Sequence, residues 1–282
     1  MFEVIFEADN GKKFTFGRRG SNYFSMNIGA GMSVTLGISQ GFTQIGETVQ
    51  TQCVGSRNID VTGKMYGDIE KRKDALRNAC PPMTSGRLVF NKEYYIRVYV
   101  KESPSFSAKW GDGTFKMQFY APFPYYSTIA EKAYSIGQIT KQFRFPVNYS
   151  KPHRFGTRST AKATDVNNEG DVPVTFRLDI RADDNCSNVT VTNLKTRSFL
   201  RITGTLNQGE RVAVYRDQDN AVRAELISGN VTTDIIDRID EDSTLFELAT
   251  GENLLTATDD EGTGKLFAQF TFHPARAALY ET

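Results

Sequence analysis

Apolar and polar residues alternate with a period of two along most of this 282-residue chain. The pattern is clear over residues 94–101, where Ile96, Val98 and Val100 alternate with aromatic or charged neighbours. Because successive side chains of a strand point to opposite faces, this pattern predicts strands that are buried on one face. Many short strands separated by Gly, Asn and Asp turns, without regular strand–helix alternation, predict a mainly β fold.

The first residues predict a hairpin. Phe2, Val4 and Phe6 alternate with acidic residues, the dipeptide Asn10–Gly11 is typical of a tight turn, and residues 14–16 form the returning strand. The glycine-rich stretch 17–55 is compatible with a long flexible arm or with several short edge strands. Periodicity does not decide between these two structures.

A single helix interrupts the strands, and we expect it at about residues 68–80. Asp68 is a suitable N-cap because its carboxylate can accept from the free backbone N–H groups of the first turn. Ile69, Leu76 and Cys80 form a narrow apolar stripe, and two prolines at 81–82 end the helix. The stripe predicts that the helix covers one face of the N-terminal sheet. Its charged side then faces solvent or a neighbouring subunit.

The remaining pattern predicts two domains with a boundary near residue 135. Residues 1–135 form an N-terminal β domain with the helix, and residues 136–282 form a β-sandwich or jelly roll. Further strands are predicted at 58–62, 87–90, 94–101, 105–110, 114–120, 174–180, 188–192, 199–203, 211–215, 221–227, 245–248, 253–258 and 266–272.

Charge differs between the two halves, although the net charge is only +1. Residues 1–135 hold 17 basic and 12 acidic side chains, and residues 136–282 hold 17 basic and 21 acidic ones. The basic residues are dispersed, and no zinc-finger or RNA-recognition pattern accompanies them, which argues against a nucleic-acid groove. The first residues lack a signal-peptide pattern, and no apolar run approaches the roughly 20 residues of a membrane span.

Cysteine and histidine are too sparse for an evident metal site. The three cysteines, Cys53, Cys80 and Cys186, are widely spaced and predict free thiols. His153 and His273 cannot supply a three-histidine site, and no cysteine has a partner at metal-ligand spacing. We therefore predict no metal and no cofactor.

Acidic residues also lack a recognisable catalytic or binding pattern. Asp217 and Asp219 begin like a calcium loop, but that loop requires glycine at its sixth position and glutamate at its twelfth. Those positions hold Val222 and Ser228, so a hairpin turn is favoured. The clusters 240–242 and 259–261 could supply a glycosidase pair only if the fold brought two carboxylates beside a sugar groove, and surface loops are the simpler reading.

One motif is compatible with an esterase. GISQG at residues 37–41 matches the Gly-x-Ser-x-Gly nucleophile elbow, with Ser39 as the nucleophile. The elbow requires a strand before the serine and a helix after it, whereas FTQIGETVQ follows here and is β-like. We therefore predict no catalytic residues and no enzymatic activity.

Read in order, several segments resemble the distal tail protein family of long non-contractile-tailed bacteriophages. The segments are GFTQIGETVQ, SRNIDVTGKMYG, DIEKRKDALRNACPP, RLVFNKEYYIRVYVK, FKMQFYAPFPYY, VNNEGDVPVTFRLDI, LKTRSFLRITGTL, GERVAVYRDQDNAVRAELI and FELATGENLLTATDDEGTGKLFAQFTF. The resemblance extends from about Gly41 to Phe272 and departs from the family in the longer glycine-rich stretch of the first forty residues.

The resemblance implies a ring-forming N-terminal domain, usually in six copies, and a galectin-like C-terminal β-sandwich. It implies a structural hub at the virion tail tip, assembled in the host cytoplasm. The ring would join the tail tube protein to the tail-tip protein and to receptor-binding proteins, and DNA would pass through it without specific binding. Such a passage predicts that much of the basic charge of residues 1–135 lies away from the channel or is paired with acids.

A carbohydrate-binding module is the alternative function, because galectin-like sandwiches often bind sugars. That role requires an exposed aromatic side chain beside polar groups. The single tryptophan, Trp110, lies in the first half, and the second half offers Phe155, Phe199 and Tyr215 without a sugar-binding signature. A wall-degrading hydrolase has only the unpaired acids and Ser39 in its favour.

Overall fold

The computed structural model describes residues 3–17, 23–29, 31–107, 113–136, 139–141, 156–158, 163–218, 220–260 and 266–279. The chain forms two compact units. Unit 1 comprises residues 1–130 together with 276–282, and unit 2 comprises residues 131–275. The chain therefore leaves unit 1 once, forms unit 2, and returns to unit 1.

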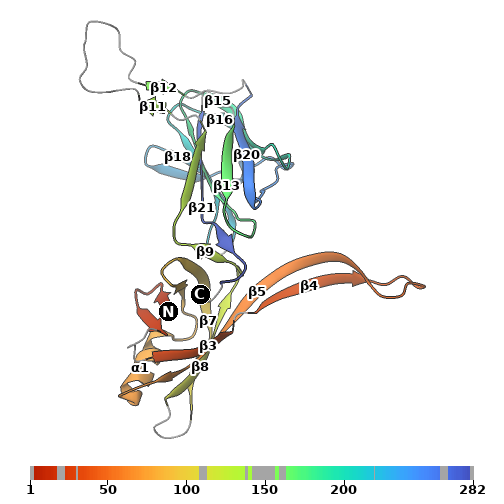
Figure 1. Cartoon of the computed structure of the whole chain (residues 1–282). Coiled ribbons are helices and arrows are strands. Elements are labelled where there is room, and N and C mark those ends of the chain that lie inside the picture. Colours follow the sequence, from red (N-terminus) through yellow and green to blue (C-terminus); the bar gives the residue numbers. More distant parts are fainter. Residues whose placement is uncertain are drawn as a thin grey trace. The chain divides into compact units, whose positions relative to one another are not determined.

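The predicted fold class is confirmed, because the described residues are mainly strands with a single α-helix (Figure 1). Unit 1 contains one antiparallel sheet with the strand order β2-β1-β6-β7-β8-β5-β3, while β4 pairs with β5, β9 with β7, and β22 with β9. Its strands are β1 (Val4–Ala8), β2 (Lys13–Phe16), β3 (Tyr23–Gly29), β4 (Met32–Ser39), β5 (Thr48–Met65), β6 (Ser85–Phe90), β7 (Tyr94–Phe106), β8 (Thr114–Ala121), β9 (Tyr126–Thr128) and β22 (Ala275–Arg276).

The predicted N-terminal hairpin is confirmed, with Val4 opposite Phe16 and Phe6 opposite Phe14 across β1 and β2. Phe2 lies outside the described residues. The inward side chains of this sheet form an aromatic core, in which the rings of Phe6 and Phe119 lie 5.0 Å apart. Full burial of a phenylalanine ring contributes about 1.5–3 kcal/mol to stability, so this core stabilises unit 1.

The predicted helix is α1 (Ile69–Ala79), and its N-cap is confirmed. Oδ1 of Asp68 accepts from the backbone N–H of Lys71 at 3.3 Å. Leu76 and Cys80 are fully buried and belong to the core of unit 1, so the helix covers the sheet as its apolar stripe predicts.

Two predicted features of unit 1 differ from the structure. The strands predicted at 94–101 and 105–110 are one strand, β7, which passes through Pro104 with register shifts around Glu102. Proline is tolerated at such an irregularity because the ladder there does not require its missing N–H. The dipeptide Asp112–Gly113 is typical of a hairpin turn between the predicted strands 105–110 and 114–120, and this turn lies partly outside the described residues.

Unit 2 contains two larger antiparallel sheets, and several of their strands bury alternate residues, as Leu178, Ile180 and Ala182 do. This arrangement is the predicted β-sandwich. The six-stranded sheet has the order β10-β21-β14-β17-β18-β19, the four-stranded sheet has the order β13-β20-β15-β16, and β11 pairs with β12. The elements are β10 (Lys132–Ile136), β11 (Ile139–Lys141), β12 (Gly156–Arg158), β13 (Thr164–Asn168), β14 (Arg177–Ala182), β15 (Cys186–Asn193), β16 (Ser198–Leu206), β17 (Arg211–Arg216), β18 (Val222–Ser228), β19 (Val231–Asp234), a 3-10 turn (Ile236–Arg238), β20 (Gly251–Thr258) and β21 (Leu266–Phe272).

The strand predicted at 245–248 is wrong. Only Leu248 makes a β-bridge, to Val174, and the preceding residues form a loop. Phe246 in this loop packs its ring against Phe176, at 5.2 Å between centroids, so its hydrophobicity reflects packing and not strand pairing.

Candidate functional site

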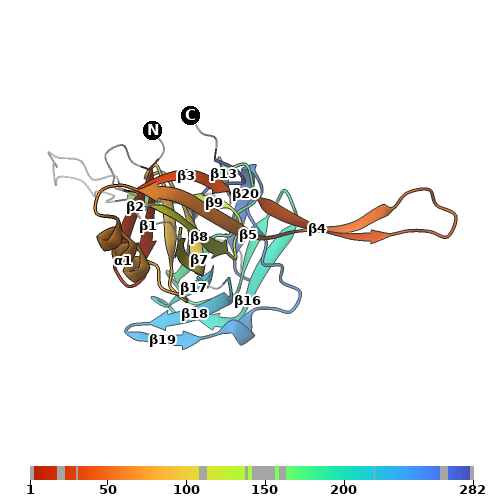
Figure 2. The ribbon, with the colours of Figure 1, turned by 90° about the horizontal axis from the view of Figure 1, so that it is seen from below.

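The most distinctive surface of unit 1 is a long hairpin, which we call the arm and define as residues 32–56. It consists of β4, the first half of β5 and the turn between them. Figures 1 and 2 both show it extending away from the rest of unit 1. The second half of β5 continues into the sheet, where it pairs with β3 and β8. Within the glycine-rich stretch, residues 32–55 thus belong to a two-stranded ribbon whose second strand continues into the sheet of unit 1.

One face of the arm is apolar and exposed. Along β4 this face carries Met32, Val34, Leu36 and Ile38, which are 39–54% exposed. Val34 lies opposite Val54, and Ile38 lies opposite Val49, so β5 adds two aliphatic residues to the same face. Phe42 and Ile45 at the tip are fully exposed.

The other face of the arm is polar and uncharged. Thr35 lies opposite Cys53, and Ser39 lies opposite Thr48. Glu47 is the sole charged residue in the sequence from 31 to 56. A two-stranded ribbon is marginally stable alone in water, and a contiguous exposed apolar face is typical of an interaction surface. The arm therefore has the properties of a protein-binding element.

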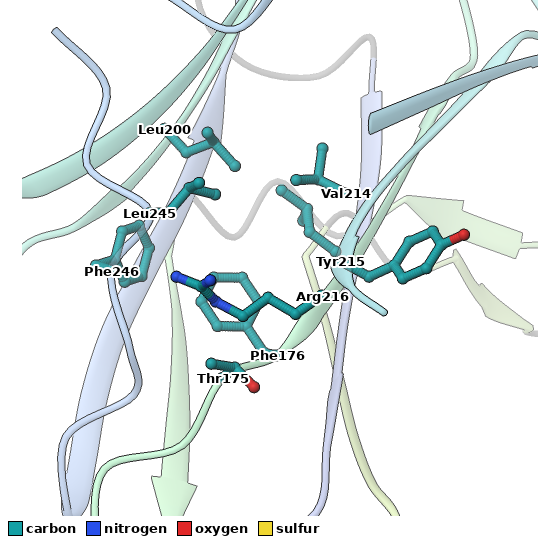
Figure 3. A pocket seen from close by; sticks show the side chains of 9 residues that line it. Thr175, Phe176, Leu200, Val214, Tyr215, Arg216, Leu245 and Phe246 are labelled. Atoms are coloured by element: carbon teal, nitrogen blue, oxygen red, sulfur yellow. The ribbon is translucent and has the colours of Figure 1, made fainter. Parts of the chain in front are cut away.

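Unit 2 has a small apolar pocket at one end of its sandwich (Figure 3). Leu200, Val214, Phe176 and Phe246 line it, and Arg216 extends across it from β17, whereas Tyr215 points away. Its volume is about 30 Å³, which is room for roughly one or two water molecules. The pocket is too small for a sugar ring.

The structure does not support the nucleophile elbow. Ser39 ends β4, pairs with Thr48 and is followed by the turn of the arm and strand β5, so the strand–turn–helix context is absent. Ser39 is a residue of the polar face of the arm.

The candidate metal ligands are not brought together. Within the part of the chain that the structure describes, no three His, Cys, Asp or Glu side chains could hold a metal ion. None of the three cysteines is in a disulfide; Cys53 is exposed on the arm, and the other two are buried. Burial raises the pKa of the Cys80 thiol to about 12. His153 lies outside the described residues, and His273 follows β21.

The acidic candidates serve local structure. Oδ1 of Asp217 accepts from the N–H of Ala221 at 2.9 Å in the β17–β18 turn. Asp240 accepts from the N–H of Asp242 at 3.0 Å, and Asp260 accepts from Asn188 at 2.6 Å. Asp219 and Glu261 lie outside the described residues.

The aromatic candidates for sugar binding do not form an open platform. The guanidinium of Arg177 covers the ring of Tyr215 at 4.6 Å, and the Tyr215 hydroxyl donates to Glu225 at 2.9 Å. Phe199 is partly buried in β16. Trp110 and Phe155 lie outside the described residues.

Among the helices of the described chain, none is long and apolar enough to cross a membrane.

Sequence reasoning left the structure of the arm open and did not identify it as a functional surface. The signal that identifies it is the alternation of four aliphatic residues in 32–38 within a segment that lacks charge from 31 to 46. A solvated hairpin normally carries charged residues on such a face.

Comparisons with known proteins agree with this architecture. Residues 169–273 match the family model described as the siphovirus-type tail component, C-terminal domain. The chain shares its fold with the Dit protein of phage SPP1, which is described as a paradigm of hub adsorption apparatus in Gram-positive-infecting phages. The TM-score is 0.66 at 15% identity, with 97% of this chain and 99% of that one covered.

Two further similar structures belong to the phage p2 baseplate in its activated conformation. The one with calcium gives a TM-score of 0.48 at 10% identity, covering 96% of this chain and 97% of that one. The one with strontium gives 0.45 at 10% identity, covering 96% and 98%. No curated protein sequence matches the chain. Residues 169–273 are thus similar to the C-terminal domain of siphovirus-type tail components, and the whole chain shares the fold of a siphovirus Dit protein, in agreement with the predicted resemblance to the distal tail protein family.

Proposed function

We propose that this protein is the structural hub of a phage tail tip and acts as a homohexameric ring without catalytic activity. The ring joins the tail tube to the tail-tip and host-adsorption proteins, and it assembles in the host cytoplasm before it becomes part of the virion. The unpartnered apolar face of the arm carries this proposal. The match to the tail-component family model and the fold shared with the SPP1 Dit protein support its assignment to a phage tail.

A second copy of this chain is the partner that best fits the arm. The apolar face is nearly free of charge, so it offers no electrostatic basis for choosing a strongly charged partner. Its exposed aliphatic residues require a permanent cover if the ribbon is to stay ordered. A closed ring gives every arm one identical neighbour and leaves no arm uncovered.

The charges of unit 1 support passage of DNA without capture. Lys13 and Arg87 both contact Glu7 at 2.7 Å, and Arg97 contacts Asp9 at 2.6 Å. A basic side chain paired in this way releases fewer counterions when it meets a phosphate. The excess basic charge of the sequence is thus partly neutralised within the subunit.

Light scattering coupled to size-exclusion chromatography tests the ring. We expect hexamers, or a concentration-dependent approach to them, and an annulus with a central hole in negative-stain images. The double variant Leu36→Glu/Ile38→Glu places charges on the apolar face of the arm and should give monomers. The matched variant Thr35→Glu/Ser39→Glu places the same charges on the polar face of the same strand and should weaken assembly less.

Monomers of the wild-type protein at every concentration, without an annulus, would overturn the proposal. Equal assembly of both double variants would instead remove the arm from the interface. The absence of catalysis is tested separately on peptidoglycan, where wild type and Ser39→Ala should both fail to cause lysis.

A further inference from the structure

The outer face of the six-stranded sheet of unit 2 carries two directly opposed arginines. Arg181 on β14 lies opposite Arg211 on β17. Both side chains are about half exposed, at 49% and 51%. Like charges directly opposite each other on neighbouring strands are destabilising. A sheet that keeps such a pair has a reason beyond its own stability.

The nearby carboxylates do not fully compensate this pair. Arg181 contacts Asp183 at 3.0 Å, at the end of its own strand. Arg211 contacts Asp179 at 3.3 Å, but that carboxylate already accepts two hydrogen bonds from Arg177, at 2.8 and 3.2 Å. Three guanidinium groups thus share two carboxylates. Each guanidinium has five N–H donors, so many donors remain open to a ligand.

A groove of about 220 Å³ lies beside the two arginines. Asp179, Ile180, Phe267 and Gln269 complete its lining. Asp179 is opposite Gln269 on β21, and Arg181 is opposite Phe267 on the same strand. Within the described part of the chain, the side-chain amide of Gln269 makes no hydrogen bond. The groove is several times larger than the apolar pocket at the end of the sandwich.

The lining selects the chemistry of a ligand. Arg181 covers the ring of Phe267 at 5.5 Å, so a neutral sugar finds no open aromatic face on which to stack. The two arginines favour an anionic oxygen, which guanidinium groups bind with charge-assisted hydrogen bonds. Asp179 accepts hydrogen bonds only, so the same ligand must also donate. An acidic peptide side chain would bring a carboxylate close to Asp179 without offering it a donor.

We propose that this groove binds a sugar that carries a carboxylate or a phosphate. The anionic group lies between Arg181 and Arg211, and neighbouring hydroxyl groups donate to Asp179 and exchange hydrogen bonds with Gln269. The site lies in unit 2 and does not involve the arm, so it functions in a monomer as well as in a ring. The inference adds an anionic-glycan site to the proposed hub.

Isothermal titration calorimetry on the full-length protein tests the site. The probes are a hyaluronate hexasaccharide, glucose 6-phosphate, neutral maltohexaose and a hexaglutamate peptide. We expect binding of the first two, weakened by added salt, and no binding of the neutral oligosaccharide. Tighter binding of the hexasaccharide would identify a polymeric ligand, and tighter binding of glucose 6-phosphate would identify a free sugar phosphate.

The variant Arg181→Gln/Arg211→Gln should reduce affinity at least about tenfold, because it removes two charge-assisted contacts. Arg223→Gln is the matched control, since Arg223 lies on strand β18 of the same sheet, contacts Asp217 at 2.9 Å and does not line the groove. That control should bind as wild type does. Without ligand, the double variant should remain folded, because the repulsion that it relieves offsets the loss of the contacts with Asp183 and Asp179.

Four results would overturn the site. They are failure of wild type to bind either anionic sugar, equal binding of maltohexaose, tighter binding of hexaglutamate, and an affinity of the double variant equal to that of wild type. Each is independent of the oligomeric state, so loss of the ring proposal leaves this one standing, and the reverse also holds.

Discussion

Arg57 and Ala277 lie 220 residues apart in the sequence and are joined by a hydrogen bond, in which Nη2 of Arg57 donates to the backbone oxygen of Ala277 at 2.6 Å. Arg57 is only 2% exposed, and its guanidinium also lies over the ring of Tyr126 at 4.6 Å. It sits on β5 at the base of the arm, opposite Ala121. One buried side chain thus fixes the returning segment of the chain to the sheet of unit 1.

Replacement of Arg57 by Met should reduce the free energy of unfolding by about 2–3 kcal/mol, because it removes a charge-assisted hydrogen bond made by a buried side chain. Urea denaturation measures this loss. Hydrogen exchange should rise selectively over residues 276–279. The control Arg87→Met changes a half-exposed arginine and should have a smaller effect. Unchanged exchange in that segment would show that other contacts hold it.

Stability should fall in mild acid partly through Glu7. Hydrogen bonds from Lys13 and Arg87 hold the pKa of its carboxyl below the usual value of 4.5. A lowered pKa in the folded state stabilises the protein fully above the unfolded value, and this stabilisation is lost as the pH falls through the folded value. The free energy of unfolding should therefore decrease from about pH 5 to about pH 3.

Glu7→Gln should flatten that pH dependence, since the amide does not titrate. Glu70→Gln changes a carboxyl of the helix whose side chain is 75% exposed and should preserve the slope of wild type. Identical slopes for wild type and Glu7→Gln would exclude this ion pair as a source of the dependence.

Asn253 organises the four-stranded sheet of unit 2 and is 1% exposed. Its Nδ2 donates to the carbonyl oxygens of Ala249 at 2.8 Å and Gly251 at 3.1 Å, and its Oδ1 accepts from Asn193 at 3.2 Å. Asn253→Asp puts a donor-free carboxylate against these carbonyls and should cost about 3 kcal/mol or more. The control Asn58→Asp retains the acceptor that Lys101 uses on the exposed sheet face. Equal melting temperatures for both variants would contradict this role.

The three thiols should differ in reactivity in the native protein. Cys53 is exposed on the arm, whereas Cys80 and Cys186 are buried, and burial raises the pKa of Cys80 to about 12. A maleimide should therefore modify Cys53 alone near neutral pH, because the thiolate is the reactive form. Mass spectrometry of tryptic peptides measures this selectivity, and Cys53→Ser should abolish labelling. Rapid modification of Cys186 would show that the sandwich opens.

Much of the fold follows from local patterns. The period-two alternation of Ile96, Val98 and Val100 gives a real strand, and Asp68 caps the helix as its side-chain chemistry predicts. The prediction of a strand at 245–248 is wrong because an apolar residue such as Phe246 can pack against the core from a loop as well as from a paired strand. Alternation alone does not distinguish these two uses.

The interaction surfaces depend on information that one strand does not contain. Whether Val34 is covered or exposed depends on what else the chain places against it, and the structure shows that it is 54% exposed. Arg181 and Arg211 are 30 positions apart, and a register slip of one residue would separate them. Register arises from all the strands of the sheet together, so the opposed arginines emerge only after folding.

The return of the chain at Arg276 makes unit 2 an insertion within unit 1 and not an appendage to it. Recombination between positions 130 and 276 would therefore exchange the whole sandwich as one block of coding sequence, and both ends of the replacement would join the same recipient body. The residues tied to Arg57 would have to survive such an exchange, because they belong to the recipient. This layout would let the sandwich be replaced without dividing the core of the arm-bearing unit.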